Sequence, residues 1–286
     1  MKRREAQLPY LLIAPTVLFV AWFFLWPLLQ ALLLAFRDTA GAFTAAHFRR
    51  MAEDFYFARA VRDTALMLVL VIPIQLVVAL AAALVVNQRF WGSNLFLYLY
   101  AVPLGISELA AGLIWLSIFT ERGYLNGVLH SLGLIGQTVA YLSHQSPRWL
   151  LTAVVVTEVW RATPLVMVIL LSGLQMIARD YLEAADSFGA SAWQKLRMVI
   201  LPLLRPSIQS ALIIRTVLAF QVFAPVIVLT GRLFPVLASE SYFWYTVVRN
   251  EHVAAAYAVL MMALSVAVTW AYLAALRTRQ EQVGAV

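Results

Sequence analysis

The chain has 286 residues, of which 63% are hydrophobic and only 12% are charged. Soluble domains are usually about 45–50% apolar and about 25% charged, so this composition excludes a cytosolic globular enzyme, a disordered chain and a free nucleic-acid-binding protein. The net charge of +7 suits basic residues at the ends of membrane spans, and the absence of cysteine excludes disulfides and zinc–thiolate sites. The sequence therefore predicts an integral membrane protein.

The first apolar segment covers residues 10–36 and lies in a charge-free stretch between Glu5 and Arg37. It follows a basic N-terminal run, as a signal peptide would. However, it is too long for the apolar part of a signal peptide and lacks a convincing cleavage site. A spanning helix needs roughly 20 mostly apolar residues. The segment is therefore predicted to be an uncleaved membrane span.

Five further apolar segments follow along the chain, and each is long enough to cross the membrane. They cover residues 64–88, 95–119, 149–177, 208–229 and 253–276. We therefore predict an all-α polytopic protein with six transmembrane helices in one domain over residues 1–286, with both termini on the same side. Lysine and arginine divide almost evenly between the two sets of loops, ten against nine, so the positive-inside rule gives no orientation.

The segment between the fourth and fifth spans, residues 178–206, is rich in signals that start and stop helices. Two pairs of residues have the spacing of capping boxes: Asp180 with Glu183, and Ser191 with Gln194. Between them, Gly189 can end a helix in a left-handed conformation. We predict two short helices joined at a glycine elbow, with Pro202 and Pro206 disturbing entry into the fifth span. Local physics leaves open whether this is only an amphipathic hairpin at the membrane surface.

The residue spacing of this loop matches a specific pattern. Glu183-Ala184-Ala185 is followed after three residues by Gly189 and, nine residues later, by Val199-Ile200-Leu201-Pro202. This spacing resembles the E-A-A loop, E-A-A-x3-G-x9-I-x-L-P, of permease subunits of bacterial and archaeal binding-protein-dependent ABC importers, with valine in place of the first isoleucine. Residues 160–177, 201–208 and 220–231 are similar to the sugar-permease branch of that family.

The resemblance implies a transport subunit, not an enzyme, with the permease fold of a type I ABC importer. Its implied partners are a second homologous permease in a heterodimer, two ABC ATPase subunits that carry ATP and Mg, and an extracytoplasmic sugar-binding protein. The implied substrate is a mono-, di- or oligosaccharide. The implied location is a prokaryotic cell membrane, surrounded by lipid, with the loop and both termini in the cytoplasm. The residues implied to couple to the ATPases are Glu183, Ala184, Ala185, Gly189, Ala190, Ser191, Leu201 and Pro202.

Four charged residues fall inside the predicted spans: Glu108, Glu158, Arg161 and Arg215. A charge at mid-membrane costs on the order of 3 kcal/mol on insertion scales, so each needs a partner or water. Glu158 and Arg161 are three residues apart on one helix face and can pair with each other. Glu108 and Arg215 are then the candidates for an ion pair between helices. These bonds either orient the helices or place Glu158 and Arg161 on the sugar pathway.

A further candidate for the sugar pathway is Gln221, which has Phe220 and Phe223 beside it. An amide can bind sugar hydroxyl groups, and aromatic rings can cover the face of a sugar. Aromatic residues at helical spacing are also typical of simple packing. The sequence does not decide between these interpretations.

The sequence contains no motif for catalysis or nucleotide binding. It has no G-x-x-x-x-G-K-[ST] phosphate loop, no H-E-x-x-H zinc motif and no G-x-S-x-G nucleophile motif. We therefore predict no catalytic residue, no metal site and no cofactor bound by this chain.

Two other functions remain open on the sequence alone. A secondary transporter driven by an ion gradient would need paired carboxylates at mid-depth, for which only Glu108 and Glu158 are available. A membrane enzyme or scaffold protein would fit the composition, but no catalytic cluster supports an enzyme. Co-purification with an ATPase would distinguish an importer permease from both.

Overall fold

The computed structural model describes residues 2–88 and 90–276, and the regular structure in these ranges is helical apart from one isolated β-bridge between Arg37 and Phe43. The all-α prediction is confirmed. Among the described residues, five helices are long and apolar enough to cross a membrane, and a bent helix pair raises the number to six if it counts as one span. The chain separates into two compact units: unit 1 contains residues up to Ala58 and Glu240–Leu260, and unit 2 contains Arg59–Ser239 and the chain from Met261 onward. The single domain over 1–286 stays a prediction.

Unit 1 contains the first long helix of the chain. α1 (Lys2–Val20) continues through a π-helical turn, η1 (Ala21–Leu25), into α2 (Trp26–Phe36). Pro27 has no amide hydrogen for the helical ladder, and the wider π turn directly before it accommodates this loss. The apolar window of the span Leu12–Phe36 has none of its residues buried within the described chain. This span agrees with the prediction for residues 10–36.

The rest of unit 1 is held to the end of α2 by two histidines. α3 (Ala46–Ala52) carries His47, and α14 (Glu251–Ala275) begins with Glu251 and His252. The two imidazole rings stack with centroids 4.7 Å apart. His47 contacts the Arg37 carbonyl oxygen at 3.0 Å, and His252 contacts the Leu34 carbonyl oxygen at 2.9 Å. The pair therefore ties α3 and the start of α14 to α2.

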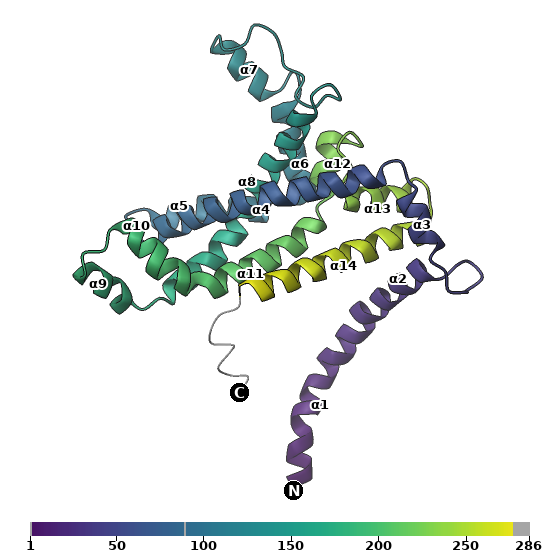
Figure 1. Cartoon of the computed structure of the whole chain (residues 1–286), viewed down its shortest axis with the longest axis horizontal. Helices are drawn as coiled ribbons and strands as arrows, with labels where there is room; N and C mark the ends of the chain where they lie inside the picture. Colours follow the sequence, from purple (N-terminus) through teal and green to yellow (C-terminus); the bar gives the residue numbers. More distant parts are fainter. Residues whose placement is uncertain (1, 89, 277–286) are drawn as a thin grey trace. The chain divides into compact units, whose positions relative to one another are not determined.

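Unit 2 contains most of the long helices (Figure 1). In chain order the α-helices of this unit are α4 (Phe57–Asn87), α5 (Ser93–Ala101), α6 (Glu108–Phe119), α7 (Tyr124–Ser131), α8 (Pro147–Gln175), α9 (Arg179–Ser187), α10 (Ala192–Lys195), α11 (Leu201–Phe220), α12 (Ala224–Thr230), the first turn of α13 (Leu237–Thr246) and the second half of α14. α8 packs against α11, and α6 packs against α12. A Cβ atom on Gly173 of α8 would collide with Ser207 of α11, so this glycine lets the two backbones approach closely.

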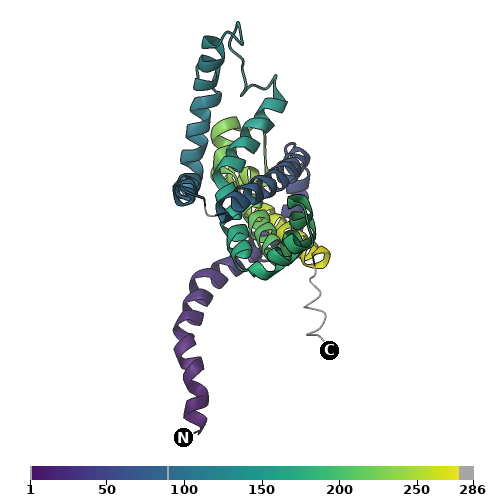
Figure 2. The same ribbon diagram turned by 90° about the vertical axis from the view of Figure 1, so that its left-hand side faces the viewer.

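The predicted third span, residues 95–119, is a bent pair of helices rather than one straight helix. α5 runs into a 3-10 turn, η2 (Val102–Gly105), and the backbone is extended at Ile106 and Ser107 before α6 begins. The Ser107 hydroxyl accepts a hydrogen bond from the Ala110 amide and caps α6. The two arms meet at 101°, and Figures 1 and 2 show α5 and α6 running in different directions. The bend follows from a proline turn and a serine cap inside an otherwise apolar run.

The structure also corrects the bounds of the predicted fifth span, residues 208–229. One long helical segment runs from Ala192 through a π turn, η3 (Leu196–Ile200), to Phe220, and α12 is a separate helix. Pro202 does not break this segment, because the π turn directly before it accommodates the missing amide. Pro225 near the start of α12 favours a new helix start instead. The second predicted short helix of the loop is therefore the first turn of a long one.

Two hydrophobic cores fill unit 2. The first includes Met67 and Val71 of α4, Val226 of α12 and, from α8, Leu150, Ala153, Val154 and Val155. The second is formed by one face of each of three helices: Ala79, Ala82, Ala83 and Val86 of α4; Val166, Met167, Leu170, Leu171 and Leu174 of α8; and Leu204 and Ala211 of α11. Gln75 of α4, and Glu158 and Arg161 of α8, lie between the segments that these two helices give to the first and the second core. These side chains belong to a polar layer between the two apolar cores.

Candidate functional site

The first candidate site is the turn between α9 and α10, named here the elbow (residues 179–195). α9 ends in a Schellman motif: the Ala190 amide donates to the Ala185 carbonyl at 3.0 Å and the Gly189 amide donates to the Asp186 carbonyl at 2.9 Å. Gly189 has a φ of 71°, as this motif requires. The elbow therefore reverses the chain at the predicted glycine.

The two helices of the elbow, α9 and α10, are capped differently at their N-termini. Ser191 and Gln194 form the predicted capping box, in which each side chain bonds to the backbone of the other residue. The predicted box of Asp180 with Glu183 is wrong, because α9 begins at Arg179 and its N-cap is Ala178. Asp180 instead lies in the first turn, where its carboxylate is stabilised by the helix dipole.

An ion pair closes the elbow across the glycine. Lys195 Nζ of α10 lies 2.6 Å from Asp186 Oδ1 of α9. Both residues are partly solvent-exposed, so the bond adds little to overall stability, although it joins the two helices across the turn. Neither residue matches a position of the E-A-A pattern, and their spacing of nine residues gave no sequence signal.

The surface of the elbow carries exposed apolar side chains. They are Tyr181, Phe188 and Trp193, with exposed fractions from 57% for Tyr181 to 91% for Phe188, and Met198 in the adjoining π turn is 71% exposed. Glu183 and Gly189 are exposed on the same element. Exposed apolar groups of this density mark contacts with another protein or with a membrane surface. The elbow is a stiff, partly apolar projection at the end of α8 and α11 (Figure 1).

The second candidate site is a network of five side chains in the polar layer of unit 2. Arg215 donates to Glu158 Oε2 at 2.8 Å and to Gln75 Oε1 at 2.6 Å. Arg161 donates to both oxygens of Glu158 at 3.1 Å and lies 3.0 Å from Glu108 Oε1. Two carboxylates and two guanidinium groups balance, so the polar layer is neutral. It joins four helices: α4, α6, α8 and α11.

The structure confirms one predicted ion pair and corrects the other. Glu158 and Arg161 pair on α8, as their spacing predicted. The predicted pair of Glu108 with Arg215 does not form, because Glu108 contacts Arg161 and Arg215 contacts Glu158. Spacing along one helix identifies partners on that helix, whereas partners on other helices depend on packing register. Gln75 was missed because it is uncharged; its only signal is that it is the one amide between Thr64 and Asn87.

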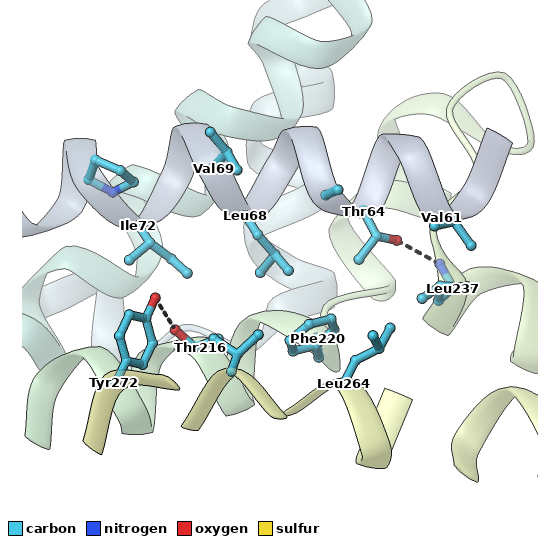
Figure 3. A pocket seen from close by; sticks show the side chains of 13 residues that line it. Val61, Thr64, Leu68, Val69, Ile72, Thr216, Phe220, Leu237, Leu264 and Tyr272 are labelled. Carbon is cyan, nitrogen blue, oxygen red and sulfur yellow. Dashed lines mark hydrogen bonds between the residues drawn. The ribbon is translucent and has the colours of Figure 1, made fainter. Parts of the chain in front are cut away.

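Phe220 lies in a different environment from the polar layer. It lines an apolar pocket of about 440 Å³ between α4, α11 and α14 (Figure 3). The pocket hydroxyl groups are already engaged: Thr64 accepts from the Leu237 amide and Thr216 bonds to Tyr272. Such a lining suits apolar packing better than a sugar.

Gln221 and Phe223 lie in the break between α11 and α12. Gln221 is exposed and Phe223 is half-buried. Within residues 2–88 and 90–276, Gln221 makes no side-chain hydrogen bond to the polar layer. The sugar-pathway role of Phe220, Gln221 and Phe223 stays a prediction. In the same described ranges, no group of three or more His, Cys, Asp or Glu side chains is placed to hold a metal ion.

Comparison with known proteins identifies related sequences and folds. Residues 75–279 match the family described as binding-protein-dependent transport system inner membrane component. The trehalose transport system permease protein of Mycobacterium tuberculosis is 33% identical over 235 residues, covering 79% of this chain and 74% of that protein. The sulfoquinovosyl glycerol transport system permease protein of Agrobacterium fabrum is 31% identical over 294 residues, covering 96% and 92%.

The fold is also similar to that of a solved structure. A chain of a bacterial ABC transporter involved in the import of the acidic polysaccharide alginate superposes with a TM-score of 0.80 at 19% sequence identity. The match covers 96% of each chain. The predicted permease fold of an ABC importer is therefore confirmed.

Proposed function

Because this chain belongs to the family of binding-protein-dependent transport system inner membrane components, we propose that it carries a sugar across the membrane as part of an ATP-driven importer. The chain is a multi-pass permease of the bacterial inner membrane and not an enzyme. A sugar cargo is supported by relatives named as permeases for trehalose and for sulfoquinovosyl glycerol. These relatives give no support to a secondary transporter driven by an ion gradient.

The observation that carries the mechanism is the elbow between α9 and α10. Its Schellman turn, capping box and Asp186–Lys195 ion pair make it stiff, and its exposed apolar side chains suit a groove on another protein. In this proposal the elbow docks on one of two cytoplasmic ATPase subunits, which hold the ATP and Mg. A second, homologous permease completes the pathway as a heterodimer, and an extracytoplasmic binding protein delivers the sugar.

The proposal sets the orientation of the chain: the elbow is cytoplasmic, and six spans then place both termini in the cytoplasm. We expect a cysteine at Ser191, which is exposed on the elbow, to react with an impermeant thiol reagent from the cytoplasmic side only. A matched cysteine at Ser131, which is exposed at the end of α7, should react from the outside only. Native cysteine is absent, so labelling is specific to the introduced residue. The reverse pattern would contradict the orientation.

A reconstitution experiment tests the function itself. Purified chain in liposomes is expected neither to hydrolyse ATP nor to take up sugar, because it lacks a phosphate loop and forms only half of the proposed pathway. Adding the second permease, the ATPase subunits and the binding protein should give ATP-dependent uptake from a panel of radiolabelled trehalose, maltose and lactose. Uptake by the chain alone under an ion gradient would contradict the importer and support a secondary transporter.

A further inference from the structure

The two ends of the polar layer differ in exposure. Glu158, Gln75 and Arg215 are 0–2% exposed, which places them in the dry interior of unit 2. At the other end, the side chain of Glu108 is 36% exposed and that of Arg161 is 16% exposed. The Glu108–Arg161 pair therefore lies at a surface of the unit, while the other residues of the layer are buried behind it.

The open pair lies at the middle of the membrane-spanning part. Arg161 is fourteen residues from either end of α8, which is about 21 Å at the rise of an α-helix. Glu108 contacts Arg161 and is therefore at the same depth. Both hydrophobic cores flank this level, one on each side. A partly exposed carboxylate and guanidinium at this depth are too costly to face lipid.

The backbone beside Glu108 supports the same conclusion independently. Ile106 and Ser107 are extended between η2 and α6, at the 101° bend. Non-helical backbone at membrane depth is tolerated where it is buried in protein or lines a water-filled cavity, but not where it faces lipid. Ser107 is exposed on this chain, so its side faces either water or another protein.

The chemistry of the open pair suits a polyol. In the part of the chain that the structure describes, Nη1 of Arg161 and Oε2 of Glu108 make no hydrogen bond. A free guanidinium donor next to a free carboxylate acceptor matches neighbouring hydroxyl groups, because each hydroxyl both donates and accepts. Arg161 is held in place by both oxygens of Glu158, which Arg215 holds in turn. The pair is therefore pre-organised rather than flexible.

We propose that Glu108 and Arg161 line the transport route and bind hydroxyl groups of the passing sugar, while Glu158 positions Arg161 and does not touch the sugar. This proposal rests on the proposed function, because it takes a sugar as the cargo. It revises the sequence-based expectation, in which Glu158 shared the pathway with Arg161. Complete burial of Glu158 removes it from any route, and the exposed Glu108 takes its place.

Water access to the pair is tested by cysteine labelling of the assembled importer in liposomes. Ser107→Cys and Glu108→Cys should react with a charged, membrane-impermeant methanethiosulfonate reagent supplied on both faces. The matched control is Ile74→Cys, which is exposed and apolar and lies beside Gln75, hence at the same depth. Ile74→Cys should stay unlabelled. Failure of both other variants to react would overturn the proposal, since the face would then be covered by lipid or by the second permease.

Sugar binding is tested with Glu108→Gln, which leaves Arg161 paired with Glu158. Uptake of whichever sugar of the trehalose, maltose and lactose panel the wild-type complex transports should show a KM raised about tenfold or more, as expected for losing one charged hydrogen bond. That same sugar should slow labelling of Ser107→Cys. The control Glu53→Gln removes a carboxylate from an exposed pair with Arg49 and should leave KM unchanged.

The outcomes separate this proposal from the proposed function. If the wild-type complex transports none of the three sugars, these three are excluded as the cargo, while labelling of Ser107→Cys still decides whether the pair faces water. If the wild-type complex transports a sugar but Glu108→Gln has an unchanged KM and the sugar gives no protection, the importer stands and Glu108 is not a sugar-binding residue.

Discussion

Replacing Glu158 with glutamine is expected to destabilise the folded protein by about 3–5 kcal/mol, the largest stability effect of any single change in the polar layer. Glu158 is completely buried and neutralises Arg215 at 2.8 Å and Arg161 at 3.1 Å. The glutamine amide is uncharged, so Arg215, which is 2% exposed, keeps hydrogen-bond acceptors but has no counter-ion bonded to it in the layer. The expected result is a lower thermal unfolding midpoint of the detergent-purified complex and less protein in the membrane.

Two companion variants make this experiment decisive. Arg215→Met should cost less than Glu158→Gln, because Glu158 keeps Arg161 as its counter-ion. The double variant Glu158→Gln with Arg215→Met should be more stable than Glu158→Gln alone, because Arg161 and Glu108 then balance each other. A Glu158→Gln protein as stable as the wild type would mean that water already screens the layer.

Replacing Gly189 with valine is expected to abolish sugar uptake and the stimulation of ATP hydrolysis by the loaded binding protein. A Cβ atom at this position would meet nothing within 4 Å, so steric collision is not the cause. The cost is in the backbone: at a φ of 71° a residue with a Cβ is strained by about 1–2 kcal/mol, and a β-branched residue suffers most. The chain should relax to another conformation and turn α10 away from its docking position.

The controls for Gly189→Val separate conformation from volume. Gly189→Asn should keep most activity, because asparagine tolerates the left-handed region. Gly136→Val adds the same side chain at a glycine that also has open space but no positive φ, and it should leave activity intact. Glu183→Lys, on the exposed face of the elbow, should lose stimulation through its charge. If both Gly189→Val and Glu183→Lys keep the stimulated ATP hydrolysis, the elbow does not couple to the ATPase and is only a hairpin at the membrane surface.

Most of the membrane helices could be predicted from the sequence because lipid imposes one simple rule, a long and predominantly apolar run. α4 and α8 followed that rule even with Pro73 and Pro164 inside them and, in α8, with Glu158 and Arg161. The bend at Ile106 and Ser107 escaped prediction because the run continues to be apolar on both sides of it. The long helix through Pro202 also escaped, since a π turn cannot be deduced from composition.

Prediction of the sites followed the same division between local and distant effects. The Schellman turn at Gly189 and the capping box at Ser191 are local, and both were predictable from a few neighbouring residues. The partners of Glu108 and Arg215 lie on other helices, so their identity depends on how α4, α6, α8 and α11 pack. Exposure was equally hidden, which is why the buried Glu158 was first placed on the sugar pathway.

The close packing of α8 on α11 has a mechanical consequence. Both helices adjoin the elbow at one end. They are in close contact at Gly173 and Ser207, and an ion pair between Glu158 and Arg215 joins them a second time. Because the two helices are joined at both places, they cannot easily slide past each other. A displacement of the elbow would therefore turn α8 and α11 together. A turn of about 5° at the end of α8 would carry Arg161, about 21 Å along, by about 2 Å. Glu108 is on α6, which also packs against α8. A turn of α8 and α11 relative to α6 would change the distance between Arg161 and Glu108, the pair proposed to bind the sugar.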